Sequence, residues 1–289
     1  MSDNTEQHIT ANVLQSLEQT ADPRLKTVLT SLISHLHAFI REVDLTEAEW
    51  LQGIQFLTRT GQICDDKRQE FMLLSDTLGV TILVDAINHR ALQGETESTV
   101  LGPFHREGAE ELPFGASISK DGRGQPVVIE GRVLAPDGTP IVGATLDVWE
   151  TSENGLYEEQ DPEQPDMNLR GIFRTDGAGR YKIVAIKPVS YSIPDDGPVG
   201  GMMRASGRSL FRPAHIHFIV AAPGYAAVTT HLFVQGDPYL ASDAVFGTKD
   251  SLVVDFVRNE SVEAAAAHGV RAPFYSVEYE FVLKPAASR

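Results

Sequence analysis

The stretch Arg212-Pro213-Ala214-His215-Ile216-His217-Phe218 decides how the second part of the chain folds. It continues directly into Ile219-Val220-Ala221, which predicts a β-strand rather than a helix. Successive side chains of a strand point to opposite faces, so His215 and His217 share one face. Two neutral imidazoles on one rigid face can hold a single metal ion. The alternative is an exposed pair of histidines, but the apolar flanks favour the metal, because buried polar groups are costly without partners.

The composition restricts the class of protein. The chain has 289 residues and a formal charge of −16, which argues against nucleic acid as a partner, because phosphate binding needs a cationic surface. Its single cysteine, Cys64, excludes a disulfide framework and any multi-cysteine metal site. The first residues resemble no signal peptide and no apolar run approaches the length of a membrane span, so we expect a cytoplasmic protein without membrane insertion.

The first part of the chain, residues 1–95, is predicted to be a helical domain. Asp22-Pro23 is a good helix start, and the apolar residues behind it recur every three or four positions, as on one stripe of a helix. Thr46 and Glu49 have the form of a capping box and open a second helix. A third helix is predicted from about Asp65 to Gln93.

From residue 96 to residue 289 the pattern changes to short β-rich segments separated by Gly and Pro. Residues 136–139 and 176–179 are typical turns, and no long helical pattern lies between the predicted strands. Strands at this spacing favour an antiparallel sandwich or barrel. The predicted fold class is therefore α+β, with an N-terminal helical region and an antiparallel β-sandwich core.

A metal bound by His215 and His217 would need further ligands. Without cysteines these must be harder donors. His231 lies in another predicted strand, Asp195 and Asp196 offer carboxylates, and two tyrosines occur in predicted loops. The loop tyrosines are Tyr157, after Glu150-Thr151-Ser152-Glu153-Asn154-Gly155-Leu156, and Tyr191, within Pro188-Val189-Ser190-Tyr191-Ser192-Ile193-Pro194. A lone loop tyrosine is more often a packing residue, so spacing alone leaves the ligand set open.

The Arg-Pro-Ala-His-Ile-His-Phe stretch together with both tyrosines resembles the intradiol ring-cleavage dioxygenases, a family of non-haem ferric enzymes. The similarity covers most of the chain. It implies that Tyr157, Tyr191, His215 and His217 bind one Fe(3+) per subunit. The fold of the family, a β-sandwich core with an N-terminal helical region, agrees with the pattern described above.

Within the family, the chain is most similar to the members that act on hydroxyquinol (benzene-1,2,4-triol). The similarity lies in residues 73–76, 97–105 and 237–247. It implies cleavage of hydroxyquinol by O2 to 3-hydroxy-cis,cis-muconate or maleylacetate in aromatic catabolism, with catechol, chlorocatechol or chlorohydroxyquinol as alternative substrates. Several catechol-specific members carry Gln where this chain has His231. We therefore interpret His231 as a hydrogen-bonding residue beside the ligands, with a fifth ligand as the alternative.

The resemblance also assigns roles around the substrate. Tyr191 would leave the metal as substrate enters and take a proton, while Arg212 would stabilise charge on the ring. On an ideal strand the Arg212 side chain would point away from the histidines, although Pro213 allows a local irregularity that would change its direction. The alternative to a role at the substrate is a salt bridge on the surface. The implied pocket walls are Leu73, Asp76, Val100, Leu101, Gly102, Pro103, Phe104, Ile193, Pro194, Arg212 and Val245. Asp76 lies one helical turn after Leu73 and could accept a hydrogen bond from a third hydroxyl, or be a cap or an ion-pair partner.

As partners, the resemblance implies the aromatic substrate, O2 and a second copy of the chain. The homodimer would form through the N-terminal helices and would hold a phospholipid in an apolar channel. Two other classes compete with this interpretation. One is a non-enzymatic, transthyretin-like binding module; the other is an Fe(II) extradiol or cupin oxygenase, which would need two histidines and a carboxylate.

Overall fold

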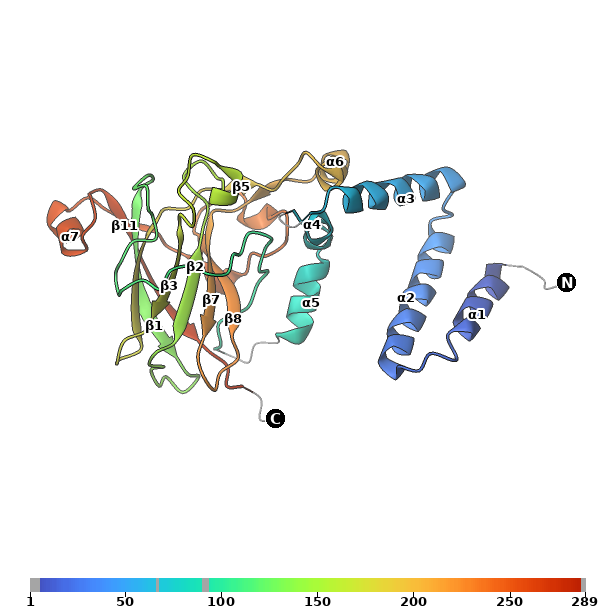
Figure 1. Ribbon diagram of the computed structural model, residues 1–289, viewed down its shortest axis with the longest axis horizontal. Helices are drawn as coiled ribbons and strands as arrows, with labels where there is room; N and C mark the ends of the chain where they lie inside the picture. Colours follow the sequence, from blue (N-terminus) through green and yellow to red (C-terminus); the bar gives the residue numbers. More distant parts are fainter. Residues whose placement is uncertain (1–5, 66–67, 90–93, 287–289) are drawn as a thin grey trace. The chain divides into compact units, whose positions relative to one another are not determined.

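The computed structural model describes residues 6–65, 68–89 and 94–286 (Figure 1). The chain divides into two compact units, Met1–Arg59 and Thr60–Arg289. None of the helices in the described ranges combines the length and the apolar character needed to cross a membrane.

The smaller unit consists of α1 (Glu6–Ser16), α2 (Pro23–Glu42) and most of α3 (Glu47–Gln62). Both predicted helix starts are confirmed. The Asp22 carboxylate accepts hydrogen bonds from the N–H groups of Arg24 and Leu25 at 2.8 and 3.1 Å. Ahead of α3, the Thr46 N–H donates to Glu49 at 2.9 Å and the Glu49 N–H donates to Thr46 at 3.3 Å.

The predicted third helix is wrong as a single element. The chain forms α4 (Glu70–Thr77) and α5 (Val80–Asn88), separated at Gly79, whose φ of 71° is left-handed. A left-handed residue ends a helix, and glycine adopts that conformation without steric cost. Residues 66–67 and 90–93, which the prediction included, lie outside the described residues. Both helices fall within the larger unit, and the predicted domain boundary at residue 95 stays a prediction.

The larger unit is built on two sheets, which confirms the predicted α+β sandwich. One has the strand order β10-β11-β1-β4 and the other β3-β2-β7-β8-β9. The strands are β1 (Pro126–Leu134), β2 (Thr145–Trp149), β3 (Arg170–Arg174), β4 (Arg180–Ile186), β7 (His215–Ala221), β8 (Val228–Val234), β9 (Val253–Val254), β10 (Val257–Asn259) and β11 (Phe274–Val282). The packed layers are seen together in Figure 1.

Each sheet contains one parallel pair, so the sandwich is not strictly antiparallel. β1 pairs with β11, and β8 with β9, in parallel register. Two consecutive strands joined by a tight turn must run antiparallel. Both of these pairs are instead joined by long connections, which allow either direction.

A third, two-stranded sheet lies beside the sandwich and consists of β5 (Tyr191–Ser192) and β6 (Phe211–Arg212). The remaining elements are short: η1 (Glu158–Gln160), α6 (Pro198–Ala205), η2 (Leu240–Ser242), η3 (Asp250–Leu252) and α7 (Val262–Ala267).

The predicted alternation along β7 is confirmed. Ile216, Phe218 and Val220 are fully buried in the core between the two large sheets. His215 and His217 therefore point to the other face of their sheet, and both are buried there as well. A buried histidine pair outside the apolar core requires polar partners, and these come from the loops and strands around it.

Candidate metal centre

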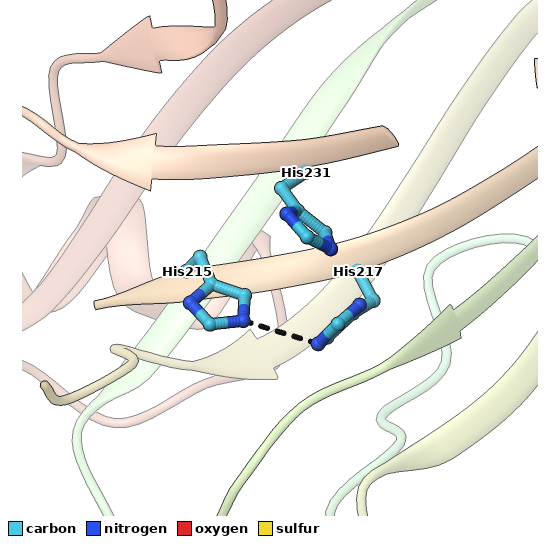
Figure 2. A group of neighbouring side chains, drawn as sticks. All are labelled: His215, His217 and His231. Carbon is cyan, nitrogen blue, oxygen red and sulfur yellow. Dashed lines mark hydrogen bonds between the residues drawn. The ribbon is translucent and has the colours of Figure 1, made fainter. Parts of the chain in front are cut away.

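Three strands place aromatic side chains in one row across the sheet. In the β-ladder, His217 of β7 pairs with Trp149 of β2 on one side and with His231 of β8 on the other. Residues paired across neighbouring strands point to the same face, so register alone brings these rings together. Figure 2 shows His215, His217 and His231 turned toward one another from the two adjacent strands.

The two tyrosines enter the same space from different elements. Tyr157 precedes η1, and its N–H donates to the Gln160 side chain at 3.0 Å, which fixes the loop. Tyr191 opens β5 and pairs with Arg212 of β6. Gly155, with φ 78°, lies directly under Tyr191: a Cβ at this position would be 3.1 Å from the Tyr191 Cβ. The close approach of these two loops therefore needs a glycine at position 155.

The donor atoms of the four predicted ligands form a chain of short contacts. The Tyr157 hydroxyl is 3.2 Å from that of Tyr191 and 2.9 Å from Nε2 of His217, and this Nε2 is 3.0 Å from Nε2 of His215. Neighbouring ligands bound about 2.1 Å from one ion lie roughly 3 Å apart when they subtend a right angle. The spacing of the four donors thus fits a single metal ion.

The hydrogen bonds of His215 also fit a metal. Its Nδ1 donates to the Pro213 carbonyl at 2.7 Å, so Nε2 carries the lone pair. Arg212 Nη1 donates to this Nε2 at 3.1 Å, and the Tyr157 hydroxyl can donate to Nε2 of His217. Nε2 of His217 lies 3.0 Å from Nε2 of His215 and can donate to it in the tautomer protonated at Nε2, whereas a bound metal would take the lone pairs of both nitrogens.

Burial sets the protonation states of the site. It lowers the pKa values of His215 and His217 well below the ordinary value, with Arg212 adding to the effect at His215 and His231 at His217. Burial, together with the neighbouring Tyr191, raises the pKa of Tyr157 well above its ordinary value. Both imidazoles are therefore neutral, which is their metal-binding form, whereas the Tyr157 phenol needs a bound cation to ionise near neutral pH.

Aromatic rings support two of the ligands from behind. Trp149 stacks on His217 with centroids 4.6 Å apart, and Phe104 stacks on Tyr157 at 4.5 Å. The guanidinium of Arg170 lies 5.9 Å from the centre of the Tyr157 ring and is held by Glu158 at 2.8 Å. Sequence reasoning missed Trp149 and Arg170. The position of Trp149 at the end of an alternating strand was the only signal for it, and Arg170 offered none.

A cavity of about 440 Å³ opens beside the site. Five of the predicted wall residues line it: Leu73, Pro103, Phe104, Ile193 and Pro194. Gly102 lies close to the ligands, since a Cβ there would be 3.5 Å from His217 Cε1. Leu101 is exposed and is not among the lining residues, and neither are the buried Asp76, Val100 and Val245.

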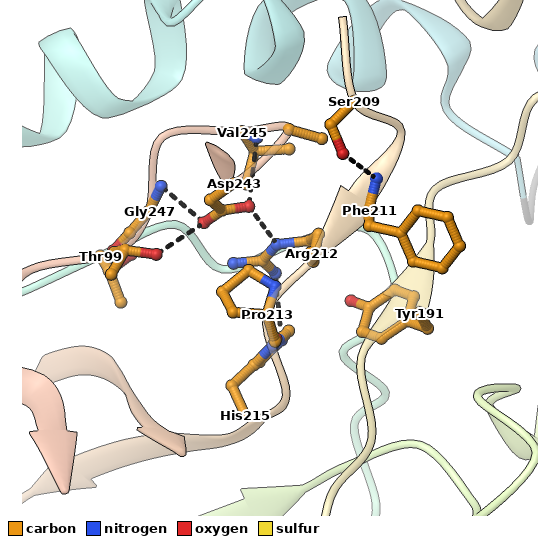
Figure 3. A network of polar contacts seen from close by, with 12 residues as sticks. Thr99, Tyr191, Ser209, Phe211, Arg212, Pro213, His215, Asp243, Val245 and Gly247 are labelled. Atoms are coloured by element: carbon orange, nitrogen blue, oxygen red, sulfur yellow. Dashed lines mark hydrogen bonds and ion pairs between the residues drawn. The ribbon is translucent and has the colours of Figure 1, made fainter. Parts of the chain in front are cut away.

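Arg212 lies on the histidine side, which answers the question left open by the sequence. Pro213 ends β6 before β7 begins, so Arg212 does not follow the alternation of β7. Its guanidinium is buried, contacts His215, and forms an ion pair with the buried Asp243 at 3.2 Å (Figure 3). The alternative of a surface salt bridge is therefore excluded.

His231 packs edge-on against His217, with ring centroids 4.1 Å apart and an interplanar angle of 84°. Neither ring nitrogen has a hydrogen-bond partner of good geometry among the described residues, although the backbone of Val100 lies close enough to oppose part of the effect of burial on the His231 pKa. Burial lowers the His231 pKa well below its ordinary value, so the ring is neutral. Its ligand atom lies within 4.8 Å of those of His215 and His217, and among the described residues this trio is the only group of His, Cys and carboxylate side chains spaced to hold a metal.

The two candidate carboxylates point elsewhere. Asp196 pairs with Arg68 at 2.8 Å and Asp195 with Arg204 at 2.9 Å. Across the described part of the chain, no carboxylate therefore joins the histidine trio, contrary to what a site of two histidines and a carboxylate would need.

Comparisons with known proteins agree with this geometry. Residues 102–285 match the family model described as dioxygenase, and residues 22–96 match the catechol dioxygenase N terminus. The chain is 49% identical to the hydroxyquinol 1,2-dioxygenase of Rhizobium sp. strain MTP-10005, over 96% of this chain and 95% of the relative. It is 45% identical to the 6-chlorohydroxyquinol 1,2-dioxygenase of Cupriavidus pinatubonensis, over 99% of both chains. Among solved structures, the hydroxyquinol 1,2-dioxygenase of Pseudomonas putida DLL-E4 superposes with a TM-score of 0.91 at 50% identity, covering 97% of this chain and 99% of that one.

Proposed function

The chain belongs to the intradiol ring-cleavage dioxygenases, a family of non-haem iron enzymes, and on this premise we propose that it cleaves hydroxyquinol with O2. The product would be 3-hydroxy-cis,cis-muconate or its tautomer maleylacetate. The observation that carries the proposal is the set of four donor atoms spaced about 3 Å apart, at the centre of a chain whose whole length resembles enzymes of this specificity.

We propose one Fe(3+) per subunit, with Tyr157, Tyr191, His215 and His217 as its ligands. Two phenolates are hard, anionic donors that favour the ferric over the ferrous ion. A bound ferric ion would supply Lewis acidity and an electron-accepting centre for a chelated diol. His231 would stay off the metal, as a neutral ring that packs against His217 and keeps that imidazole in place.

The protein's own groups would then act on the substrate. As its phenolate, the form that a bound ferric ion would favour, Tyr191 would take a proton from one substrate hydroxyl as the diol enters and become a neutral phenol; its oxygen lies 3.2 Å from that of Tyr157. The buried guanidinium of Arg212 would stabilise the negative charge that builds on the ring. Leu73, Phe104 and Ile193 of the cavity wall would exclude water and hold the ring.

Asp76 would read the third hydroxyl of hydroxyquinol. It is buried at the end of α4, and its Oδ1 has no hydrogen-bond partner among the described residues. A buried carboxylate oxygen without a donor is costly, and a substrate hydroxyl would satisfy it. Val100, Leu101, Gly102, Pro103, Pro194 and Val245 complete the proposed pocket.

The assembly and the location are also proposals. We propose a cytoplasmic homodimer formed through the N-terminal helices, with a phospholipid at the interface. One stripe of α2 and its C-cap residue carry large apolar side chains that are exposed in the single chain, a pattern that supports a partner surface: Leu25, Val28, Leu32, Leu36, Phe39 and Ile40 of the helix, and Val43 at its end.

A substrate panel tests the proposal. Purified, iron-loaded protein should take up one O2 per hydroxyquinol and release the ring-opened diacid, with lower kcat/KM on catechol. The similarity to a 6-chlorohydroxyquinol enzyme over 99% of both chains makes that compound the second candidate substrate. Absence of O2 uptake with every diol and triol would contradict the proposed function.

A further inference from the structure

The guanidinium of Arg212 has two partners, a carboxylate at its Nε edge and a proposed metal ligand at Nη1. Its Nε donates to the Asp243 carboxylate at 3.2 Å, and Nη1 at the other side reaches Nε2 of His215 at 3.1 Å. Nη2 is buried and has no hydrogen-bond partner among the described residues. The position of the cation relative to the metal ligands therefore depends on what holds its Nε edge.

The Asp243 carboxylate is surrounded by donors from a single turn. One oxygen accepts from Arg212 and from the Val245 N–H at 3.3 Å. The other accepts from the Gly247 N–H at 2.9 Å and lies 3.4 Å from the Thr248 hydroxyl. As Figure 3 shows, the chain from Asp243 to Gly247 wraps around the carboxylate while Arg212 approaches from β6. The turn is thus built to point one carboxylate at one guanidinium.

Gly247 leaves the space that this arrangement needs. A Cβ at position 247 would lie 3.0 Å from the Thr99 hydroxyl, 3.1 Å from Arg212 Nη2 and 3.2 Å from Asp243 Oδ2. A side chain there would press on both members of the ion pair at once. The pair and the glycine therefore form one packed unit.

We propose that Asp243 is the positioning residue for Arg212: it fixes the guanidinium by its Nε edge so that the other edge faces the metal ligands and the substrate. This inference rests on the proposed function, because Arg212 is assigned there to the charge that builds on the ring. Asp243 also holds the Val245 N–H, so the same carboxylate ties the cation to a proposed wall of the substrate pocket.

The test is a double-mutant cycle of Asp243→Asn and Arg212→Gln on the full, iron-loaded chain. Asparagine keeps the size of the side chain and an acceptor for the turn, but it loses the charge that orients Arg212. We expect kcat/KM for hydroxyquinol to fall about 100-fold in Asp243→Asn, mainly through kcat, as for a catalytic group misplaced by about 1 Å. The double variant should lose no more activity than Arg212→Gln alone, because the two residues act as one unit.

The matched control is Asp176→Asn. Asp176 also caps a turn, accepting from the N–H groups of Ala178 and Arg180, and also pairs with an arginine at 2.8 Å, but it lies between β3 and β4 outside the metal cavity. The Asp176→Asn variant should have the same kcat/KM for hydroxyquinol as the wild type. The tyrosinate charge-transfer band of the resting protein should be the same in Asp243→Asn and wild type, since Asp243 contacts none of the metal ligands.

Gly247→Ala tests the same unit without removing a charge, and it covers the case in which Asp243→Asn does not fold. It should lower kcat by about tenfold while the resting band stays unchanged. Losses that multiply in the double variant, or an unaltered kcat in both Asp243→Asn and Gly247→Ala, would overturn the role of Asp243. A wild type that takes up no O2 with any diol or triol would instead overturn the proposed function, and this inference with it.

Discussion

The Tyr157 hydroxyl lies 2.9 Å from Nε2 of His217, although the two residues are 60 positions apart in the chain. Tyr157 comes from the loop after β2, and His217 comes from the neighbouring strand β7. Trp149, the last residue of β2, stacks on the His217 ring. The strand order thus places the phenol and the imidazole at one point.

Asp76 should set the preference for a third hydroxyl. We expect Asp76→Ala to lower kcat/KM for hydroxyquinol by about 10- to 100-fold, because a buried polar group left without its hydrogen bond costs about 1–3 kcal/mol. Catechol lacks the third hydroxyl and serves as the control substrate in the same assay, with little change expected. If kcat/KM falls equally for hydroxyquinol and catechol, Asp76 does not set the preference for the third hydroxyl.

Glu150 should make stability depend on pH. Its carboxyl is fully buried, and burial raises its pKa well above the ordinary value, while one oxygen accepts from the Ile186 N–H at 3.0 Å. The folded protein therefore binds this proton more tightly than the unfolded chain does. The resulting stabilisation is complete below the unfolded pKa of about 4.3, and is lost by about 1.4 kcal/mol per pH unit as the pH rises toward the folded pKa.

Glu150→Gln removes this dependence and keeps an acceptor for Ile186. In urea unfolding, the variant should match the wild type near pH 4 and become progressively more stable than it at higher pH. Glu111→Gln is the control, since Glu111 is exposed and Arg174 lowers its pKa instead. A difference between Glu150→Gln and wild type that does not change with pH would contradict the buried, protonated state.

Part of the site could be predicted from the sequence because it depends on residues close together in the chain. The alternation of Ile216 and Phe218 against His215 and His217 is a property of one strand, and the structure confirms it. Helix starts at Asp22 and Thr46 were also readable, since each cap involves residues only a few positions apart. The break at Gly79 was missed because the apolar pattern continues on both sides of it.

What could not be read from the sequence depends on contacts between distant segments. The direction of Arg212 is set by Asp243, which lies 31 positions later, and by the separate strand β6. Trp149 reaches His217 only through the pairing of β2 with β7. The parallel pairing of β1 with β11 joins the two ends of the sandwich, and no local turn signals it.

The apolar stripe of α2 should mediate dimerisation. Replacing Leu32 and Leu36 with aspartate introduces charges into a surface that is apolar and exposed in the single chain. If the stripe is the interface, analytical ultracentrifugation should show the dimer dissociation constant raised by at least about 100-fold, as expected for losing about 3 kcal/mol at an interface. Val262→Asp, an exposed apolar residue of α7, is the control and should leave the assembly unchanged.

Removal of the metal should destabilise the larger unit. The folded chain holds Nε2 of His215 and Nε2 of His217 3.0 Å apart, a spacing that the unfolded chain does not preform, so metal binding favours the folded state. At an iron concentration 100-fold above its dissociation constant, binding should add about 2.7 kcal/mol to the free energy of unfolding. Chelated and reconstituted samples, compared by urea unfolding, measure this difference; equal midpoints would contradict a metal bound by the folded state.

The visible spectrum of the iron-loaded protein tests the four-residue ferric site most directly. We predict a tyrosinate-to-ferric charge-transfer band in the wild type, an altered band in both Tyr157→Phe and Tyr191→Phe, and an unaltered band in Tyr279→Phe, whose hydroxyl lies near Ser251 outside the site. An iron-loaded wild type without such a band, or a band that neither Tyr157→Phe nor Tyr191→Phe changes, would contradict the proposed ligand set.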